Sequence, residues 1–336
     1  MILVTGATGF VGAHLLYFLL QKEDKIRAIY RSETKIEQVK EVFSYYGDNV
    51  NELLERINWI KADITEVPTM IEAFVGIEKV YHCAALVSFN SKDYHEMQKV
   101  NIEGTAIVAN LAIKAEVKKL CYVSSIAAVG NSIKNKEITE ENEWNKESDN
   151  SDYAITKFGG EMEVWRASQE GISIVIVNPG VILGSGFWNT GSGKLFSKIN
   201  TGFKYHTKGI TGFVGVIDVV TAMIKLMESP IKNERFILVS ENISFKKVLF
   251  FIASILQKKR PSTLLKPWQT ELFWRFSKIA SFFTAKTPLL SKHTARSIHS
   301  VSRYSSEKIK KTIDFDFTAI EDVISNVGKH FFKRKA

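Results

Sequence analysis

A glycine-rich turn near the start of this 336-residue chain restricts its fold more than any other sequence feature. Gly6, Gly9 and Gly12 directly follow the apolar run Ile2–Val4 and directly precede leucines at helical spacing. In this arrangement the first glycine permits a tight turn, the second lets backbone approach a pyrophosphate, and the third lets helix and strand pack closely. The N-terminus of the helix then points at negative charge. The turn predicts a dinucleotide-binding site made by Gly6, Thr8, Gly9, Phe10, Val11 and Gly12.

The first 180 residues alternate strand-like runs with helical patterns. The expected strands are Ile2–Val4, Ile26–Tyr30, Ile57–Lys61, Lys79–His82, Leu120–Val123 and Ile174–Val177. The expected helices are residues 11–20, Ile36–Leu54, Met70–Phe74, Ile102–Ala115 and Tyr153–Ser168. Such alternation predicts an α/β protein with a doubly wound parallel sheet, a Rossmann fold, because helices then cover both faces of the sheet.

The pattern changes after Asn178-Pro179-Gly180. A glycine-rich stretch from Gly184 to Gly215 predicts loops and turns near a site, whereas Val216–Met227 resumes a helix and Arg235–Val239 a strand. From Ser244 the pattern is mostly helical. We therefore expect an NAD(P)-binding domain of residues 1–178, completed by residues 216–240. Residues 179–336 should then form substrate-binding loops and a smaller, mostly helical lobe over the carboxyl edge of the sheet.

Charge is unevenly distributed along the chain. The whole sequence has a net charge of +9, but Ser244 to Lys311 holds 15 lysines and arginines against two acids. Such a segment either attracts phosphates or anionic lipid, so that peripheral membrane contact stays open, or is a solvated surface. We expect no nucleic-acid partner, because no recognised binding module accompanies the charge. The same segment contains eight aromatic residues: Phe250, Phe251, Trp268, Phe273, Trp274, Phe276, Phe282 and Phe283. They suit contact with a small-molecule substrate that is apolar or anionic. The more ordinary interpretation is that they form the core of the lobe.

Cysteines and apolar segments give expectations about the compartment. Cys83 and Cys121 both lie in apolar runs, which is typical of small buried residues in a reducing compartment. The chain begins with a strand-like run and no basic segment ahead of it, which predicts no signal peptide. The apolar stretch Val248–Leu256 is too short to cross a bilayer. We expect a cytoplasmic protein, and we expect no metal site.

The end of the second expected strand predicts which dinucleotide binds. At this position an acidic residue bonds the ribose 2′-hydroxyl of NAD, and a basic residue accepts the 2′-phosphate of NADP. Arg31 follows the strand here, with Lys35 nearby, so NADP is favoured, while Glu33 keeps NAD open. Asp63 and Ile64, after the third strand, are placed to cap the adenine ring.

A tyrosine and a lysine four residues apart form the candidate catalytic pair. Tyr153 and Lys157 share one helix face. A free tyrosine has a pKa near ~10, and a lysine charge about 4 Å away favours its phenolate by up to ~4 kcal/mol at an effective dielectric near 20. The pair therefore suits moving a hydroxyl proton as hydride leaves the adjacent carbon. Ser125 ends a strand at the carboxyl edge, where it could hold a substrate oxygen, with Ser124 as an alternative.

Together the motifs resemble the extended short-chain dehydrogenase/reductase family, also called the NAD-dependent epimerase/dehydratase family. They are TGATGFVG at residues 5–12, DI at 63–64, HCAA at 82–85, NIEGT at 101–105, VSS at 123–125, YAITK at 153–157 and NPGVILG at 178–184. The matches span about 180 residues in the family order. The resemblance implies the predicted fold and a nicotinamide cofactor.

The resemblance also implies roles for single residues. Tyr153 would be the general acid/base, Lys157 its electrostatic partner and a ribose ligand, and Ser125 the donor to the substrate oxygen, with Asn101 in support. Residues in matching motifs would line the cofactor: Ala84, Ala85, Pro179 and Val181. Family members often form homodimers through the helices that correspond to residues 102–115 and 153–168, so a homodimer is open here.

Departures from the family pattern narrow the expected reaction. Sugar 4,6-dehydratases carry Thr-Asp-Glu where this chain has Ser125-Ile126-Ala127, so it lacks their extra acid–base pair. Asn178-Pro179 and Arg31 make the chain more similar to the dihydroflavonol-reductase and 3β-hydroxysteroid-dehydrogenase-like branch. The favoured expectation is hydride transfer between NADP(H) and a ketone or secondary alcohol. A nucleotide-sugar epimerase with tightly bound NAD and a non-enzymatic nucleotide-sensing protein stay as alternatives.

Overall fold

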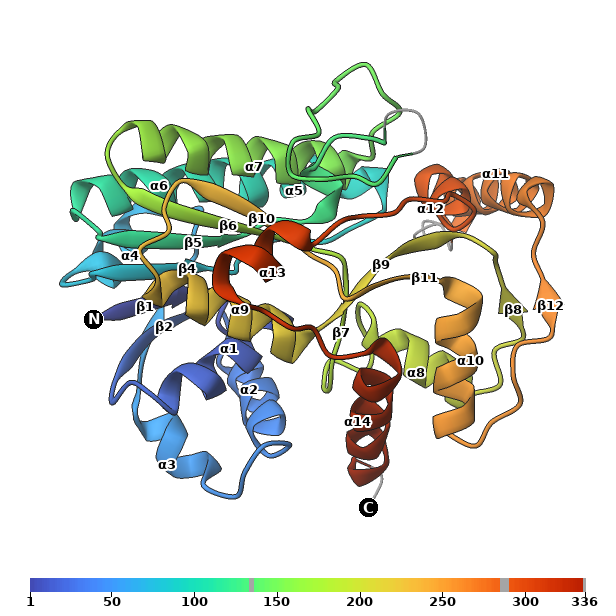
Figure 1. Ribbon diagram of the computed structural model, residues 1–336, viewed down its shortest axis with the longest axis horizontal. Helices are drawn as coiled ribbons and strands as arrows, with labels where there is room; N and C mark the ends of the chain where they lie inside the picture. Colours follow the sequence, from blue (N-terminus) through green and yellow to red (C-terminus); the bar gives the residue numbers. More distant parts are fainter. Residues whose placement is uncertain (133–135, 285–289, 335–336) are drawn as a thin grey trace.

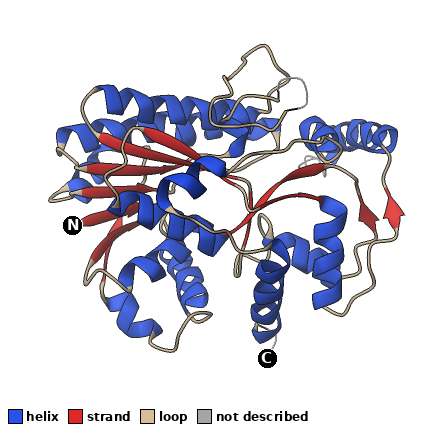
Figure 2. Ribbon diagram, viewed as in Figure 1, coloured by secondary structure: helices blue, strands red, loops and turns tan. Residues whose placement is uncertain are grey.

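A seven-stranded parallel sheet forms the centre of the molecule (Figures 1 and 2). The computed structural model describes residues 1–132, 136–284 and 290–334, with the backbone alone for 279–284. The sheet has the order β10-β6-β5-β4-β1-β2-β3, and every neighbouring pair is parallel. Its strands are β1 (Ile2–Thr5), β2 (Ile26–Tyr30), β3 (Ile57–Lys61), β4 (Lys79–His82), β5 (Lys119–Val123), β6 (Ser173–Pro179) and β10 (Glu234–Leu238). The order reverses between β1 and β4, which confirms the predicted doubly wound α/β fold.

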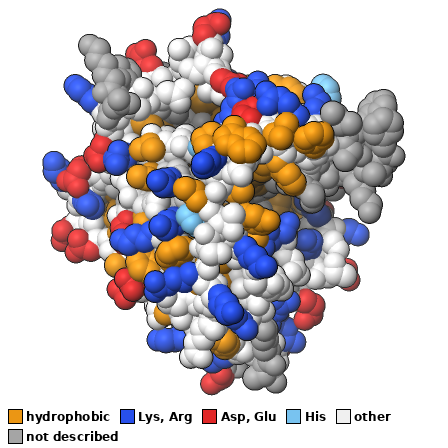
Figure 3. Space-filling model, turned by 90° about the vertical axis from the view of Figure 1, so that its right-hand side faces the viewer, with side chains coloured by type: hydrophobic (Ala, Val, Ile, Leu, Met, Phe, Trp, Pro, Cys, Tyr) orange, Lys and Arg blue, Asp and Glu red, His pale blue; other side chains and the backbone are white. Residues whose placement is uncertain are grey.

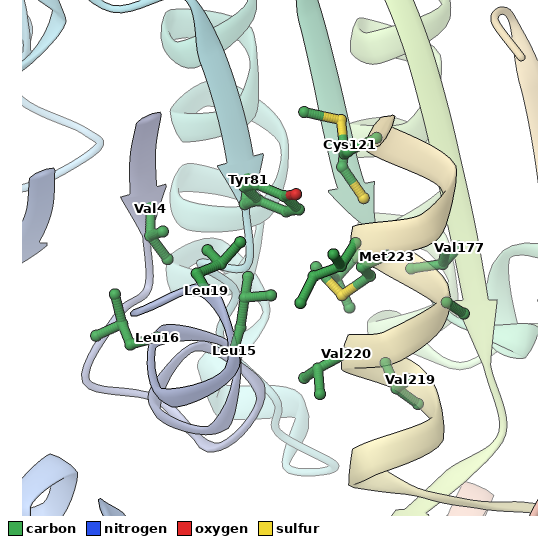
Figure 4. Packing of buried hydrophobic residues seen from close by; sticks show 14 of the residues in the cluster. Val4, Leu15, Leu16, Leu19, Tyr81, Cys121, Val177, Val219, Val220 and Met223 are labelled. Carbon is green, nitrogen blue, oxygen red and sulfur yellow. The ribbon is translucent and has the colours of Figure 1, made fainter. Parts of the chain in front are cut away.

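Helices cover both faces of this sheet. On one face lie α1 (Phe10–Leu20), α2 (Ile36–Phe43) and α9 (Val216–Glu228), and on the other lie α4 (Val67–Phe74), α6 (Gly104–Lys114) and α7 (Asp152–Gln169). Figure 4 shows Leu15 and Leu19 of α1 and Met223 of α9 beside Tyr81 and Cys121 of the sheet. These side chains are almost fully buried, as expected for a sheet whose strands are apolar on both faces.

The long helix predicted over Ile36–Leu54 is wrong. The structure has two helices there, α2 and α3 (Val50–Glu55), separated by a turn. Gly47-Asp48-Asn49 are poor helix formers, and the apolar spacing that continues past them concealed the break. The turn lets Tyr46 leave the helix axis and hydrogen-bond through its hydroxyl to His14 Nδ1 at 2.5 Å.

Apart from α9 and β10, the part of the chain after β6 forms a smaller lobe, which is mostly helical after Ser244 as predicted. The expectation of loops and turns over Gly184–Gly215 is wrong. The Gly184–Gly215 stretch contains a helix and two strands, and one strand is the middle of a three-stranded sheet with the order β11-β9-β7. The elements are β7 (Val181–Leu183), α8 (Gly193–Asn200), β8 (Tyr205–His206), β9 (Ile210–Gly215), β11 (Glu241–Ser244), α10 (Phe245–Ile255) and α14 (Ile320–Lys333). Phe196, Phe213, Ile252 and Ile324 form the centre of the lobe's own core.

The remaining elements lie along one side of this lobe. β12 (Thr263–Leu264) pairs with β8, and α11 (Pro267–Thr284) packs on α12 (Lys292–Ser297), with α13 (Glu307–Ile313) nearer the main sheet. Trp268, Phe273 and Phe276 of α11 are exposed, so the expectation that they form a core is wrong. The side chains of Phe282 and Phe283 lie outside the described residues. Within the described part of the chain, no helix is both long enough and apolar enough to span a membrane.

Candidate active site

The glycine-rich turn has the shape that a bound pyrophosphate requires. Gly6 has φ +63°, and a Cβ there would lie 2.5 Å from the backbone nitrogen of Ala84. A Cβ on Gly12 would lie 2.2 Å from the carbonyl oxygen of Gly6, so α1 begins in direct contact with the turn. Gly9 is the N-cap of α1 and supplies no capping side chain, and no acid lies in the first turn of the helix. The free amides and the positive end of α1 therefore suit the diphosphate of a dinucleotide.

Arg31 and Asp63 lie together where the ribose and adenine are expected. Arg31 follows β2, its side chain is 67% exposed, and its Nη1 lies 3.6 Å from Asp63 Oδ2. Burial raises the pKa of the Asp63 carboxyl, but hydrogen bonds from Thr65 and the Arg31 charge together lower it below its usual value. The charged Asp63 carboxylate therefore holds the Arg31 guanidinium near the strand ends where we expect the cofactor to bind. Ile64 is placed differently: it is buried in the core against Gly104.

The other predicted cofactor residues surround the same edge. Ala84 and Ala85 follow β4, where Ala84 is half-buried beside Gly6 and Ala85 is exposed. Pro179 ends β6 and is buried, whereas Val181 begins β7 and is half-buried. Thr8, Phe10 and Val11 are half-buried at the start of α1. The structure therefore gathers these residues around the carboxyl ends of β1, β4 and β6.

Tyr153 and Ser125 meet at the same sheet edge. Ser151 caps α7 by accepting a hydrogen bond from the Ala154 amide at 3.2 Å, which places Tyr153 in the first turn of the helix. Burial raises the pKa of the Tyr153 phenol, and the nearby Ser125 hydroxyl partly offsets this shift. The phenol is therefore protonated at neutral pH in the cofactor-free protein. Ser124 points elsewhere: its hydroxyl donates to Glu161 Oε2 at 2.6 Å.

Lys157 lies one turn after Tyr153 and is 1% exposed. Its ammonium donates to the Tyr122 hydroxyl and to the Val123 carbonyl, both at 2.8 Å, and lies 4.4 Å from the centre of the Tyr122 ring. Burial lowers the pKa of Lys157 to about 7, and the negative charge of Glu161 acts in the opposite direction. The charge that would support the Tyr153 phenolate therefore titrates near neutral pH.

Glu161 is a site residue that the sequence analysis missed. It lies four residues after Lys157 and is fully buried. Its carboxylate accepts hydrogen bonds from Ser124 and from Asn178 Nδ2 at 2.9 Å, and it pairs with Arg235 Nη1 at 3.2 Å. The sequence signal for Glu161 was its spacing, because Tyr153, Lys157 and Glu161 follow one another in steps of four residues. Because Asn178 also donates to the Ser125 carbonyl at 3.0 Å, Glu161 connects the helix to the serine strand end.

The Asn101 side chain holds neighbouring backbone segments in place and does not face the carboxyl ends of the strands, where we expect the cofactor. A turn of π-helix over Lys99–Glu103 directs its side chain into the core. Its amide exchanges hydrogen bonds with Leu86, with Leu86 N to Oδ1 at 2.7 Å and Nδ2 to Leu86 O at 2.9 Å, and donates to Thr156 Oγ1 at 3.0 Å. Asn101 thus joins the segment after β4 to the helix of Tyr153 and Lys157.

His82 completes this buried network. Thr105 donates its only hydroxyl proton to the Asn101 carbonyl at 2.7 Å, so His82 Nε2 must donate to Thr105 Oγ1 at 3.0 Å. His82 Nδ1 then accepts from Thr5 Oγ1 at 2.6 Å. Burial, and then the Lys157 charge, lower the pKa of His82 to about 3, so the ring is neutral. The glycine turn, Asn101 and the helix that carries Tyr153 and Lys157 are therefore held by one chain of hydrogen bonds.

An exposed aromatic ring beside Tyr153 was also missed. Phe89 lies on the loop after β4, is 58% exposed, and its ring centre lies 5.9 Å from that of Tyr153. Val87 on the same loop is 59% exposed. An exposed ring edge-on to a candidate acid/base suits contact with an apolar substrate. A loop phenylalanine carries no spacing signal, so only the fold reveals this position.

Comparisons with known proteins agree with this geometry. A family model described as "Male sterility protein" matches residues 4–233, which cover the glycine turn and the Tyr153–Lys157 helix. The chain belongs to this family, within the extended short-chain dehydrogenases/reductases. It is therefore an NAD(P)-dependent oxidoreductase, which confirms the predicted enzyme class.

Individual relatives extend the match over the whole chain. "Sterol demethylase protein B" of Methylococcus capsulatus is 27% identical over 99% of this chain and 98% of its own. Dihydroflavonol 4-reductase of Gerbera hybrida is 28% identical over 77% of this chain and 72% of its own. Among solved structures, UDP-glucose 4-epimerase of Thermotoga maritima superimposes with a TM-score of 0.78 at 19% identity, covering 100% of this chain and 99% of its own. The structural likeness shows the shared fold.

Proposed function

We propose that this enzyme transfers hydride between NADP(H) and a ketone or secondary alcohol, with Tyr153 as the acid/base. The single observation that carries the proposal is the placement of Tyr153 in the first turn of α7, with Lys157 one turn later and Ser125 nearby, at the strand ends where the glycine turn opens. The elimination of water catalysed by sugar dehydratases needs a further acid–base pair, and Ile126 and Ala127 follow Ser125 here. Simple redox chemistry needs only the groups present.

Ser125, Tyr153 and Lys157 have separate roles in the proposed reaction. When bound, NADP(H) supplies or accepts the hydride. Ser125 Oγ holds the substrate oxygen. The Tyr153 hydroxyl gives this oxygen a proton during reduction, and the Tyr153 phenolate takes one from it during oxidation. Lys157 stabilises the phenolate that reduction leaves behind.

NADP(H) fits the residues at the carboxyl ends of the sheet strands. Gly6, Gly9 and Gly12 would hold the diphosphate, and Lys157 the ribose near the nicotinamide. Arg31 would pair with the 2′-phosphate, because its guanidinium is exposed and an arginine fork matches phosphate oxygens. The partial neutralisation of Arg31 by Asp63 keeps NAD as a weaker ligand.

The substrate is proposed to be largely apolar. By their names, the relatives above act on a sterol and on a dihydroflavonol, both built of fused or linked rings. Phe89 and Val87 offer exposed apolar surface next to Tyr153 and support such a substrate. A homodimer through α6 and α7 stays a prediction.

The test is the absorbance of reduced nicotinamide in the presence of cyclic ketones, aryl ketones and secondary alcohols. We expect turnover with NADPH, and Tyr153→Phe should lower kcat by at least about 100-fold, because the ring stays while the proton donor is lost. Tyr205→Phe, at an exposed position of strand β8, is the matched control. Full activity in Tyr153→Phe would overturn the role of Tyr153. NAD that copurifies with the protein and recycles without net redox would favour an epimerase.

A further inference from the structure

Helix α11 presents an apolar stripe to solvent instead of burying it. Trp268, Leu272 and Phe276 stand four residues apart on one helix face, with Phe273 beside them, and their exposed fractions are 63%, 47%, 61% and 49%. The opposite face packs on α12, where the buried Thr270 hydroxyl bonds to the Ala295 carbonyl and to His299 Nε2 at 2.9 Å. A helix of a globular protein usually turns its apolar stripe inward, so this orientation needs an external partner.

Positive charge surrounds this stripe. Figure 3 shows hydrophobic side chains gathered on the upper part of this face, with lysines and arginines around and below them. The one acid of α11, Glu271, is engaged by Arg275 and Arg296, each at 3.0 Å. Further exposed basic residues lie on α10 and on the segment between α10 and α11: Lys246, Lys247, Lys258, Lys259, Arg260 and Lys266. The partner must therefore be both apolar and negatively charged.

A hollow of about 340 Å³ lies on α10, whose chain continues through β12 into α11. Lys246 and Arg260 stand over the Phe250 ring at 5.3 and 5.6 Å, and Lys247 stands over the Phe251 ring at 5.4 Å. His206 contacts the Phe250 ring, and its carbonyl accepts a hydrogen bond from Leu265 N at 2.9 Å, just before α11 begins. Cations held above aromatic rings around an open hollow suit a phosphate-bearing headgroup.

We propose that α11 and the α10 hollow form a docking surface for an anionic lipid bilayer. The helix lies in the plane of the interface with Trp268, Leu272, Phe273 and Phe276 among the acyl chains, while the surrounding lysines and arginines meet the headgroups. Tryptophan is well suited to this boundary, because its ring is amphipathic. A second copy of the chain fits less well, since a two-fold contact would bring two positive faces together.

This surface is connected to the candidate active site. Arg296 of α12 donates from Nη1 to Asp149 Oδ2 at 2.7 Å, two residues before the Ser151 cap of the Tyr153 helix. Bound lipid would therefore lie beside α12, which contacts the segment just before the Tyr153 helix. Bilayer binding itself needs neither cofactor nor turnover, so its failure is separable from failure of the proposed reaction.

The test is flotation of the purified full-length protein with vesicles at low salt. We expect strong binding to phosphatidylcholine vesicles that contain about 30 mol% phosphatidylglycerol, at least tenfold weaker binding to phosphatidylcholine alone, and release at high salt. Trp268→Ser/Phe276→Ser should lose most of the binding, and so should Lys246→Glu/Lys247→Glu. Matched controls change similarly exposed residues elsewhere: Val67→Ser/Ile71→Ser on α4, and Lys40→Glu with Lys114→Glu.

Several results would overturn this proposal. The first is that the protein does not bind anionic vesicles. The second is that Val67→Ser/Ile71→Ser on α4 loses as much binding as Trp268→Ser/Phe276→Ser on α11. A protein that is dimeric in solution and becomes monomeric in Trp268→Ser/Phe276→Ser, without vesicle binding, would assign the stripe to self-association. An unchanged melting temperature and NADPH affinity in each variant show that the fold is intact.

Discussion

Arg235 of β10 places its Nη1 3.2 Å from Oε1 of Glu161, a carboxylate that is completely closed to solvent. This ion pair ties the edge strand of the sheet to the helix that carries Tyr153 and Lys157. The same carboxylate also raises the pKa of Lys157 against the effect of burial. Glu161 therefore acts on the candidate site through another charged residue, as a positioning residue.

Glu161→Gln is predicted to move the pH dependence of the reaction. The amide keeps the shape of the carboxylate but removes its charge, so the pKa of Lys157 should fall further below its usual value. If charged Lys157 supports the phenolate, the alkaline limit of kcat/KM should shift to lower pH. We also expect a loss of about 2 kcal/mol in the free energy of unfolding, because Arg235 loses its buried partner.

The control for this variant lies on the same helix. Glu163→Gln breaks a more exposed ion pair with Arg166 and should leave the pH profile in place. A profile that is identical in wild type and Glu161→Gln would show that Glu161 has only a structural role.

Lys157→Met is predicted to change how stability depends on pH. The folded protein holds the pKa of Lys157 at about 7, whereas a lysine in the unfolded chain titrates near ~10.4. Between these values the unfolded state binds the proton that the folded state releases, so wild-type stability rises with pH. From pH 6.5 to pH 9 the variant should therefore lose about 2 kcal/mol relative to wild type. Urea unfolding at both pH values measures this, with Lys114→Met as the exposed control; a difference that does not change with pH contradicts it.

The two later glycines of the turn are predicted to respond differently to alanine. A Cβ at Gly9 would meet only the Gly6 carbonyl oxygen, at 3.1 Å, so Gly9→Ala should fold and bind NADPH at least about tenfold more weakly. A Cβ at Gly12 would lie 2.2 Å from the same oxygen, so Gly12→Ala should destabilise the fold by several kcal/mol. Melting curves with and without NADPH separate the two effects. Equal melting temperatures for the two variants would contradict this account of the turn.

Local sequence patterns predicted most of the central sheet. Ile26–Tyr30, Ile57–Lys61 and Lys79–His82 have the predicted bounds, because each is an isolated β-branched run between polar turns. The prediction failed where apolar spacing indicated a helix and the intervening residues disfavoured one. Apolar spacing continues across Gly47, although Gly47-Asp48-Asn49 disfavour a helix, and the packing of Tyr46 on His14 accompanies the break between α2 and α3.

The candidate site was predictable where residues stand at motif spacing, as for Gly6, Tyr153 and Lys157. Glu161 also lies four residues after Lys157, but this spacing did not reveal its burial, because a carboxylate on a helix rich in charge usually faces solvent. Its burial depends on Arg235, from a strand 74 residues further along. Phe89 and the exposed stripe of α11 were missed for the opposite reason. Aromatic residues are normally assigned to a core, and only tertiary structure shows that they face outward.

The most direct test of the account is a titration of the purified protein with NADPH and NADH, followed by nucleotide fluorescence, for wild type and Arg31→Asp. Mass analysis of the untreated preparation detects any cofactor that copurifies. Exchangeable cofactor, tighter binding of NADPH than of NADH, and at least about tenfold weaker NADPH binding in Arg31→Asp are predicted. Tightly bound NAD in the preparation, or NADPH binding that does not depend on Arg31, would contradict an NADP(H)-dependent reductase.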